Sequence, residues 1–316
     1  GVPVAKHGNR AASSKCGSSD LLSELGVQIE LEKRRAEASL RENGITYMHA
    51  PAFHPAMKFA GPVRKELGFR TIFNLLGPLS NPASAPVQTI GVFHPDLVDL
   101  FARVLKGLGV RSAFTFHGAG GLDEVSLLGP TRAAKLRGGK VSRVTFSPSQ
   151  AGLKKARLKD LLGGSPKNNA EIARNLLRGK KDAYRDGVCF STGVALLAAD
   201  VEKTVRAGVK RAQGAIDSGE ALRKLESWAA WTRKGYTWPR SWSPIIALSV
   251  QVLWRKKSPK GSLVKGLSVL NADIFTTSTQ RSLVGPFRSM KVSWFLFGGK
   301  STLVPDIGVF HVDSWK

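Results

Sequence analysis

The sequence has few cysteines and no long hydrophobic run, and each shortage excludes a class of protein. Its 316 residues include only Cys16 and Cys189, so no disulfide framework is indicated and a reducing compartment is favoured. The longest apolar run near the C-terminus, residues 245–254, is interrupted by Ser249 and Gln251 and is too short to span a bilayer. No signal-peptide pattern is found at residue 1. We therefore expect a soluble cytoplasmic protein, or a plastid one if a transit peptide precedes this sequence.

Acidic residues are also scarce. There are 48 Lys and Arg residues against 23 Asp and Glu residues, which gives a formal net charge of +25 and a pI of about 10.5. Such a charge favours polyanionic partners: nucleic acid, an acidic membrane surface or a phosphorylated substrate.

The composition changes near Trp228. No glutamate follows Glu226, all seven tryptophans lie at or beyond Trp228, and residues 229–316 hold 13 basic residues against 3 acidic ones. We expect an α/β domain over residues 1–228, in which helical periodicity ends near Trp228, and an irregular, basic, Trp-rich tail over 229–316. The tail is either a small β-rich domain or sequence that is not an evolved domain. The lack of a clean hairpin or repeat favours the second.

Strand-like and helix-like segments alternate before this break. Strands are expected at 2–5, 45–49, 89–93, 112–117 and 140–146, and helices at 20–25, 31–42, 56–67, 96–108, 169–177 and 195–218. Residues 71–75 are apolar, and Gly77-Pro78 and Asn81-Pro82 predict a loop after them. The alternation predicts an α/β fold with a mainly parallel sheet covered by helices, in which ligands bind beyond the carboxyl ends of the strands.

The first such strand end carries groups suited to phosphate. The run KHGNR, residues 6–10, follows the apolar residues 2–5, and SSKCGSSD, residues 13–20, leads into a helix. Lys6 and Arg10 can bind phosphate oxygens, and Gly8 lets the backbone approach a ligand. The alternative interpretation is a solvated basic loop followed by ordinary N-capping by Ser18 or Ser19.

Two other segments carry candidate site residues. Asp123-Glu124 follows the turn at residues 118–121, and adjacent carboxylates suit Mg²⁺, although such a pair is more often solvated surface. Arg64 can pair with a substrate carboxylate, but Lys65-Glu66 beside it resembles a solvated face. No Ser/His/Asp triad order and no Cys/His metal spacing stands out.

Five motifs occur in a familiar order. KHGNR with SSKCGS, HPAMK with GPVRKELG, RTIFNLLGPLSNP, GLDEVSLLGPT and LLGGSPKNNAEI together resemble anthranilate phosphoribosyltransferase, with similarity from residue 1 to about 228. The resemblance implies the large α/β domain of the nucleoside phosphorylase/phosphoribosyltransferase fold. It also implies transfer of phosphoribosyl from phosphoribosyl diphosphate to the amine of anthranilate, a step of tryptophan biosynthesis, with Mg²⁺ as cofactor and a homodimer as assembly.

The resemblance implies a role for each matching residue. Asn9, Arg64 and His54 would bind anthranilate, with Arg64 on its carboxylate, and Asp123 and Glu124 would bind Mg²⁺. No side chain is assigned as a catalytic base, since an aromatic amine does not obviously need one. The phosphoribosyl diphosphate site would comprise Lys6, His7, Gly8, Asn9, Arg10, Ala11, Ala12, Ser13, Ser14 and Ser18.

The sequence departs from the family pattern at its start. The glycine-rich GTGGD loop that normally precedes the first motif does not occur in these residues, so little or no turnover is expected of this chain. The alternative function is a non-catalytic nucleic-acid-binding relative of the same fold, which the net charge motivates. Asp123, Glu124 and Arg64 count against it, because a plain polyanion binder has no need of them. A nucleoside phosphorylase is disfavoured by the KHGNR and HPAMK strings.

Overall fold

The structure of the chain is a computed structural model. It describes residues 1–10, 15–67, 71–234, 250–257, 263–270 and 291–293. The chain divides into two compact units, Gly1–Tyr236 and Thr237–Lys316. Among the described helices, none combines the length and the apolar character that crossing a membrane requires.

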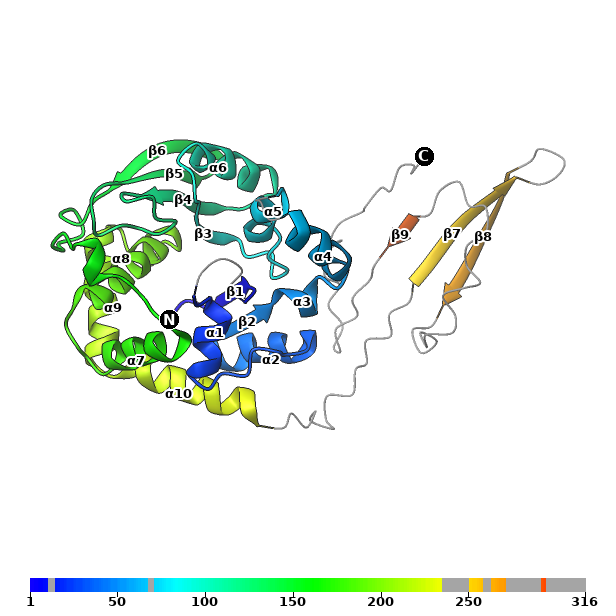
Figure 1. The fold of residues 1–316 in the computed structure, drawn as a ribbon. Coiled ribbons are helices and arrows are strands. Elements are labelled where there is room, and N and C mark those ends of the chain that lie inside the picture. The colour runs from blue at the N-terminus through cyan, green and yellow to red at the C-terminus, as the bar shows by residue number, and fades with distance from the viewer. Residues whose placement is uncertain (11–14, 68–70, 235–249, 258–262, 271–290, 294–316) are drawn as a thin grey trace. The chain divides into compact units, whose positions relative to one another are not determined.

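The first unit contains two sheets (Figure 1). A parallel pair is formed by β1 (Val4–Gly8) and β2 (Ile45–His49), and Val4 pairs with Ile45 in its register. The second sheet has the strand order β3-β4-β5-β6, in which β3 and β4 are parallel and the other two pairs are antiparallel. Its strands are β3 (Val87–Gly91), β4 (Ser112–Gly118), β5 (Thr131–Arg137) and β6 (Lys140–Phe146).

Ten α-helices are described in this unit. They are α1 (Ser18–Glu24), α2 (Lys33–Asn43), α3 (Ala50–Phe53), α4 (Met57–Leu67), α5 (Phe73–Leu79), α6 (Leu97–Gly107), α7 (Pro166–Leu177), α8 (Ala183–Ala198), α9 (Val205–Asp217) and α10 (Glu220–Arg233).

Alternating side chains of β4 give the four-stranded sheet two buried faces. Phe114 and Phe116 point to the core formed with α8 and α9, which includes Phe190. Ala113, one residue out of phase, packs into the core formed with α6. Because successive residues of a strand face opposite sides, β4 is buried by helices on both sides. This confirms the predicted α/β class.

Helix α10 closes the core of the β1–β2 pair. The Trp228 Nε1–H donates to Ser39 Oγ at 2.9 Å, and the Ser39 hydroxyl donates to the Ile45 carbonyl at 2.7 Å. Both side chains are buried, Trp228 to 3% and Ser39 to 0% exposure. The last turns of the first unit are therefore joined to α2 and β2, near its beginning.

The sheet is less parallel than the sequence indicated. Strand β5 was not predicted, and it contributes both antiparallel pairs. Its sequence TRAAKLR has one β-branched residue, Thr131, and no aromatic one, although its Ala133, Ala134 and Leu136 are fully buried. Burial by the helices, rather than local propensity, fixes this strand.

Three predicted boundaries were wrong. The single helix expected at 195–218 is broken between α8 and α9, where Asp200 has a φ of 60° and Thr204 caps α9 by accepting from the Ala207 N–H. Gly77-Pro78 lies inside α5 rather than in a loop. Helical periodicity was expected to end near Trp228, whereas α10 continues to Arg233, because Trp228 and Ala229 are core residues.

The second unit contains three described strands. They are β7 (Val250–Lys257), β8 (Leu263–Leu270) and β9 (Lys291–Ser293), in the antiparallel order β8-β7-β9. The sequence showed no clean hairpin pattern here, yet β7 and β8 pair in antiparallel register, with Val250 opposite Leu270.

Candidate functional site

The carboxyl ends of β1 and β2 meet at one edge because the strands are parallel. At this edge the Nε2 atoms of His7, on β1, and His54, which follows α3, lie 3.1 Å apart. Their ring planes are inclined by 73° with centroids 4.9 Å apart. Burial, followed by the nearby His54, lowers the pKa of His7, while a hydrogen bond to the Gly77 backbone opposes the shift. His7 is therefore a neutral imidazole at neutral pH.

The polar residues after His7 are partly engaged with each other. Asn9 Oδ1 accepts from the Arg10 N–H at 2.8 Å. The Arg10 guanidinium lies 3.7 Å from an Asp20 carboxylate oxygen and 3.5 Å from one of Glu30. Arg10 is more than half exposed, so these surface pairs can open at little cost. The structure thus shows Arg10 paired with two carboxylates through weak contacts that an anion could displace.

The start of α1 differs from the N-cap expected at Ser18 or Ser19. The N-cap residue is Gly17, whose backbone N–H donates to Asp20 Oδ2 at 2.9 Å. Ser18 is the first helical residue, so its hydroxyl is not used as the cap. The predicted phosphate-binding residues Ala11, Ala12, Ser13 and Ser14 lie outside the described residues.

Asp123 and Glu124 lie on a loop that crosses the carboxyl ends of β3 and β4. A Cβ atom on Gly91 would lie 1.7 Å from the Asp123 carbonyl oxygen, and one on Gly118 would lie 2.3 Å from that of Glu124. The buried Ser126 holds the loop, since its hydroxyl donates to the Ala119 carbonyl at 2.8 Å. Glycine at both strand ends is therefore what lets the acidic loop lie against the sheet.

The electrostatics of Glu124 connect this loop to β1. Its side chain is accessible to solvent, yet desolvation by the surrounding protein, followed by the adjacent Asp123, raises the pKa of Glu124. The ammonium group of Lys6 and a hydrogen bond with Ser191 act in the opposite direction. Lys6 and Glu124, two predicted site residues 118 positions apart, therefore lie within electrostatic reach of each other.

Arg64 is not joined to the groups described above. On α4, its guanidinium carbon is 5.4 Å from the centroid of the Phe73 ring on α5, a cation–π contact. Among the described residues, no hydrogen bond or ion pair joins Arg64 to the other predicted site residues. The structure thus brings together His7 with His54 and Lys6 with Glu124, and leaves Arg64 beside Phe73.

Three buried polar residues beside this edge were missed by the sequence analysis. Ser19, Tyr47 and His49 are exposed by 0%, 1% and 6%. The Ser19 hydroxyl lies close enough to the Tyr47 phenol to lower its pKa, and His49 Nε2 has no hydrogen-bond partner among the described residues. A Cβ on Gly8 would lie 2.8 Å from the Tyr47 hydroxyl oxygen, so Gly8 makes room for this ring. The alternation of polar residues within ITYMH was the available signal, and it was interpreted only as a strand.

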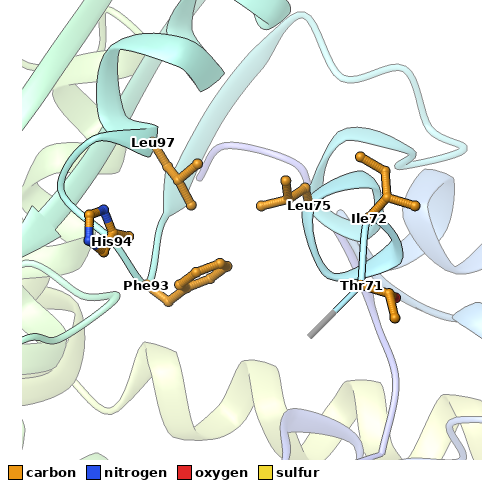
Figure 2. Close-up of a pocket in the computed structure, with 6 residues that line it drawn as sticks. All are labelled: Thr71, Ile72, Leu75, Phe93, His94 and Leu97. Carbon is orange, nitrogen blue, oxygen red and sulfur yellow. The ribbon is translucent and has the colours of Figure 1, made fainter. Parts of the chain in front are cut away.

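A pocket of about 380 Å³ lies between α5 and the turn before α6 (Figure 2). Figure 2 shows Leu75, Phe93 and Leu97 pointing into the space between the two segments. None of the predicted site residues lines it, so it is separate from the groups described above. Its lining residues are Thr71, Ile72, Leu75, Phe93, His94 and Leu97.

The donor set at residues 123–124 fits a magnesium ion. The Asp123 carboxylate helps to raise the pKa of Glu124, so a cation beside the pair would relieve this repulsion, and Mg²⁺ commonly takes one or two carboxylates plus substrate phosphates and water. Within the described residues, no group of three or more His, Cys, Asp or Glu side chains is arranged to hold a metal. A magnesium ion here would therefore need oxygen ligands from a substrate or from water.

Comparisons with known proteins agree with this geometry. The family described as "Glycosyl transferase family, a/b domain" matches residues 1–222. The anthranilate phosphoribosyltransferase of Moorella thermoacetica is 47% identical over 231 residues, covering 73% of this chain and 68% of the relative. That of Desulfosudis oleivorans is 48% identical over 234 residues, covering 74% of this chain and 69% of the relative.

Solved structures give the same result. The anthranilate phosphoribosyltransferase of Thermus thermophilus superimposes with a TM-score of 0.70 at 42% identity, covering 74% of this chain and 70% of that one. The Saccharomyces cerevisiae enzyme in complex with PRPP and Mg superimposes with a TM-score of 0.67 at 30% identity, covering 72% of this chain and 64% of that one. The chain therefore belongs to the anthranilate phosphoribosyltransferase family, and residues 1–222 are its glycosyl transferase a/b domain.

Proposed function

We propose that this chain transfers the phosphoribosyl group of phosphoribosyl diphosphate to the amine of anthranilate and releases diphosphate. The observation that carries the proposal is the Asp123-Glu124 loop packed against the carboxyl ends of β3 and β4, with the Lys6 ammonium close enough to lower the pKa of Glu124. A cation beside a carboxylate pair suits a substrate whose diphosphate carries Mg²⁺. The catalytic domain is proposed to extend to the end of α10, since that helix completes its core.

The chemistry requires charge neutralisation and positioning. The bond between C1 of the ribose and the diphosphate oxygen breaks, the amine nitrogen forms a bond to C1, and one amine proton is released. When bound, Mg²⁺ supplies positive charge that stabilises the departing diphosphate. Asp123 and Glu124 would hold this ion, and the ammonium group of Lys6 would contact the leaving diphosphate oxygens.

The aromatic substrate needs orientation rather than activation. Arg64 is proposed to pair with the anthranilate carboxylate, and its present contact with Phe73 would hold the guanidinium plane for that purpose. Asn9 offers both a donor and an acceptor to the amine and carboxylate. Holding the amine at attack distance from C1 lowers the activation free energy by a large part, because the two reactants are already oriented.

The test is product formation by the full chain. With Mg²⁺ and both substrates, we expect phosphoribosylanthranilate to accumulate slowly and to be detectable by mass spectrometry after long incubation. The variant Glu124→Gln should abolish this product, whereas Glu37→Gln, an exposed acid on α2, should not change it. Equal product from the wild type and Glu124→Gln, or none from the wild type, would contradict the proposal.

Assembly and alternative partners are tested separately. The family resemblance implies a homodimer, which light scattering on the full chain would test. The proposal assigns no role to nucleic acid, although the net charge of +25 makes weak, salt-sensitive association expected at low ionic strength. Retention of an oligonucleotide near physiological salt would favour the nucleic-acid-binding alternative.

A further inference from the structure

The His7–His54 pair has a geometry that a hydrogen bond alone does not require. The two Nε2 atoms are 3.1 Å apart. The centroids, at 4.9 Å, are closer than two rings pointing straight at each other along that line would be. The rings are therefore tilted off the line that joins their Nε2 atoms.

This spacing is close to the distance between two nitrogen atoms that bind one tetrahedral metal ion. Two imidazole nitrogens bound to Zn²⁺ at about 2.0–2.1 Å with a tetrahedral angle are separated by about 3.3 Å. The observed 3.1 Å differs from this by an amount that small ring rotations supply.

The surroundings of His7 support the same role. Its Nε2 faces His54, so its hydrogen bond to the Gly77 backbone falls to Nδ1. A ring N–H given to a carbonyl fixes the tautomer whose Nε2 carries a lone pair, which is the usual arrangement of a metal-binding histidine.

We infer that His7 and His54 form a two-histidine site for a borderline divalent transition-metal ion, Zn²⁺ first. Imidazole nitrogen selects such ions, whereas Mg²⁺ prefers the oxygen ligands of Asp123 and Glu124. The two remaining positions of the ion would be filled by water or by a chelating small molecule. Within the described residues no third His, Cys, Asp or Glu joins the pair, so binding would be reversible.

Zinc on this pair would also affect the transfer reaction, and this effect alone rests on the proposed function. Anthranilate presents an adjacent amine and carboxylate, which can chelate one metal ion through nitrogen and oxygen. An ion on His7 and His54 would bind this substrate through its amine lone pair. Because that lone pair must attack C1, Zn²⁺ would inhibit the transfer.

Metal binding is tested on the full chain without any need for turnover. We expect one equivalent of Zn²⁺ to bind in competition with a chromogenic chelator in the presence of excess Mg²⁺. His7→Gln and His54→Gln should each weaken binding by about 10-fold to 100-fold. His94→Gln should leave it unchanged, since His94 is exposed and distant in sequence from the pair.

A second measurement uses the wild type alone and does not depend on folding of the variants. Cu²⁺ bound to the chain should give an electron paramagnetic resonance spectrum with hyperfine coupling from two imidazole nitrogens. Coupling to fewer than two, absence of stoichiometric Zn²⁺ binding, or equal binding by the wild type and His7→Gln would each overturn the inference. Because these readouts involve no substrate, they succeed or fail independently of the proposed transferase activity.

Discussion

Replacing Ser39 by alanine is the sharpest perturbation of the packing that joins the two ends of the first unit. The Ser39 hydroxyl accepts from Trp228 Nε1–H and donates to the Ile45 carbonyl, and it is fully buried. Alanine keeps the size and helix position but removes both hydrogen bonds. The indole N–H of Trp228 is then left buried without an acceptor.

The magnitude follows from these contacts. A buried donor left unpaired costs about 1–3 kcal/mol, and the Ile45 carbonyl adds less because an oxygen in a sheet has a second lone pair. Alanine is the better helix former and returns about 0.5 kcal/mol in α2. We therefore expect Ser39→Ala to lower the free energy of unfolding by about 2 kcal/mol.

The assay is equilibrium unfolding in urea, followed by far-ultraviolet circular dichroism. The matched control is Ser227→Ala on α10, where an exposed serine donates to the Lys224 carbonyl of its own helix, and its effect should stay within about 0.5 kcal/mol. In a Trp228→Phe background, Ser39→Ala should cost less than in the wild type, since the donor is gone. If Ser39→Ala costs no more than Ser227→Ala, the buried bridge is not a stabilising contact and the argument fails.

Three further predictions concern the acidic loop and the extent of the folded unit. Gly91→Ala should displace the loop and lower Mg²⁺ affinity in calorimetry, because its Cβ would overlap the Asp123 carbonyl, whereas Gly107→Ala, with no atom within 4 Å, should not. Since the pKa of Glu124 is raised in the folded state, stability should fall as pH rises from the ordinary carboxyl pKa through the raised value. Thermal melts without Mg²⁺ should show this fall in the wild type and lose it in Glu124→Gln; the same slope in both would contradict it. A chain ending at Tyr236 should keep the melting temperature of the first unit, and a marked drop would show that residues beyond it contribute to that core.

The sequence predicted those elements whose apolar residues fall on the face that the fold buries. β2 and the strong apolar periodicity of α6 were predicted nearly to the residue, since both are apolar on the faces they bury. β5 was missed because its burial depends on α6 and α8, which sequence patterns around residue 131 do not reveal. The extension of α10 was missed for a related reason, since its last turn is held by hydrogen bonds to Gln28, Arg35 and Glu42.

The sequence predicted the individual residues of the candidate site, but it did not predict which of them lie next to each other. The motifs marked Lys6, His7, His54 and Glu124 separately. Which of them meet depends on the parallel pairing of β1 with β2 and on the loop that crosses Gly91. Long-range placement of this kind is set by tertiary packing, which no local pattern encodes.

The contacts of α10 also set an order of events during synthesis. Trp228 bonds a residue 189 positions earlier, and Thr232 accepts from the Gln28 N–H across 204 positions. At about 5–20 residues per second, the ribosome needs about 10 to 40 s to make the chain between these partners. Throughout that interval the apolar side of β2 has no α10 to cover it. The nascent chain is therefore most open to aggregation, and to capture by chaperones, before residue 232 emerges.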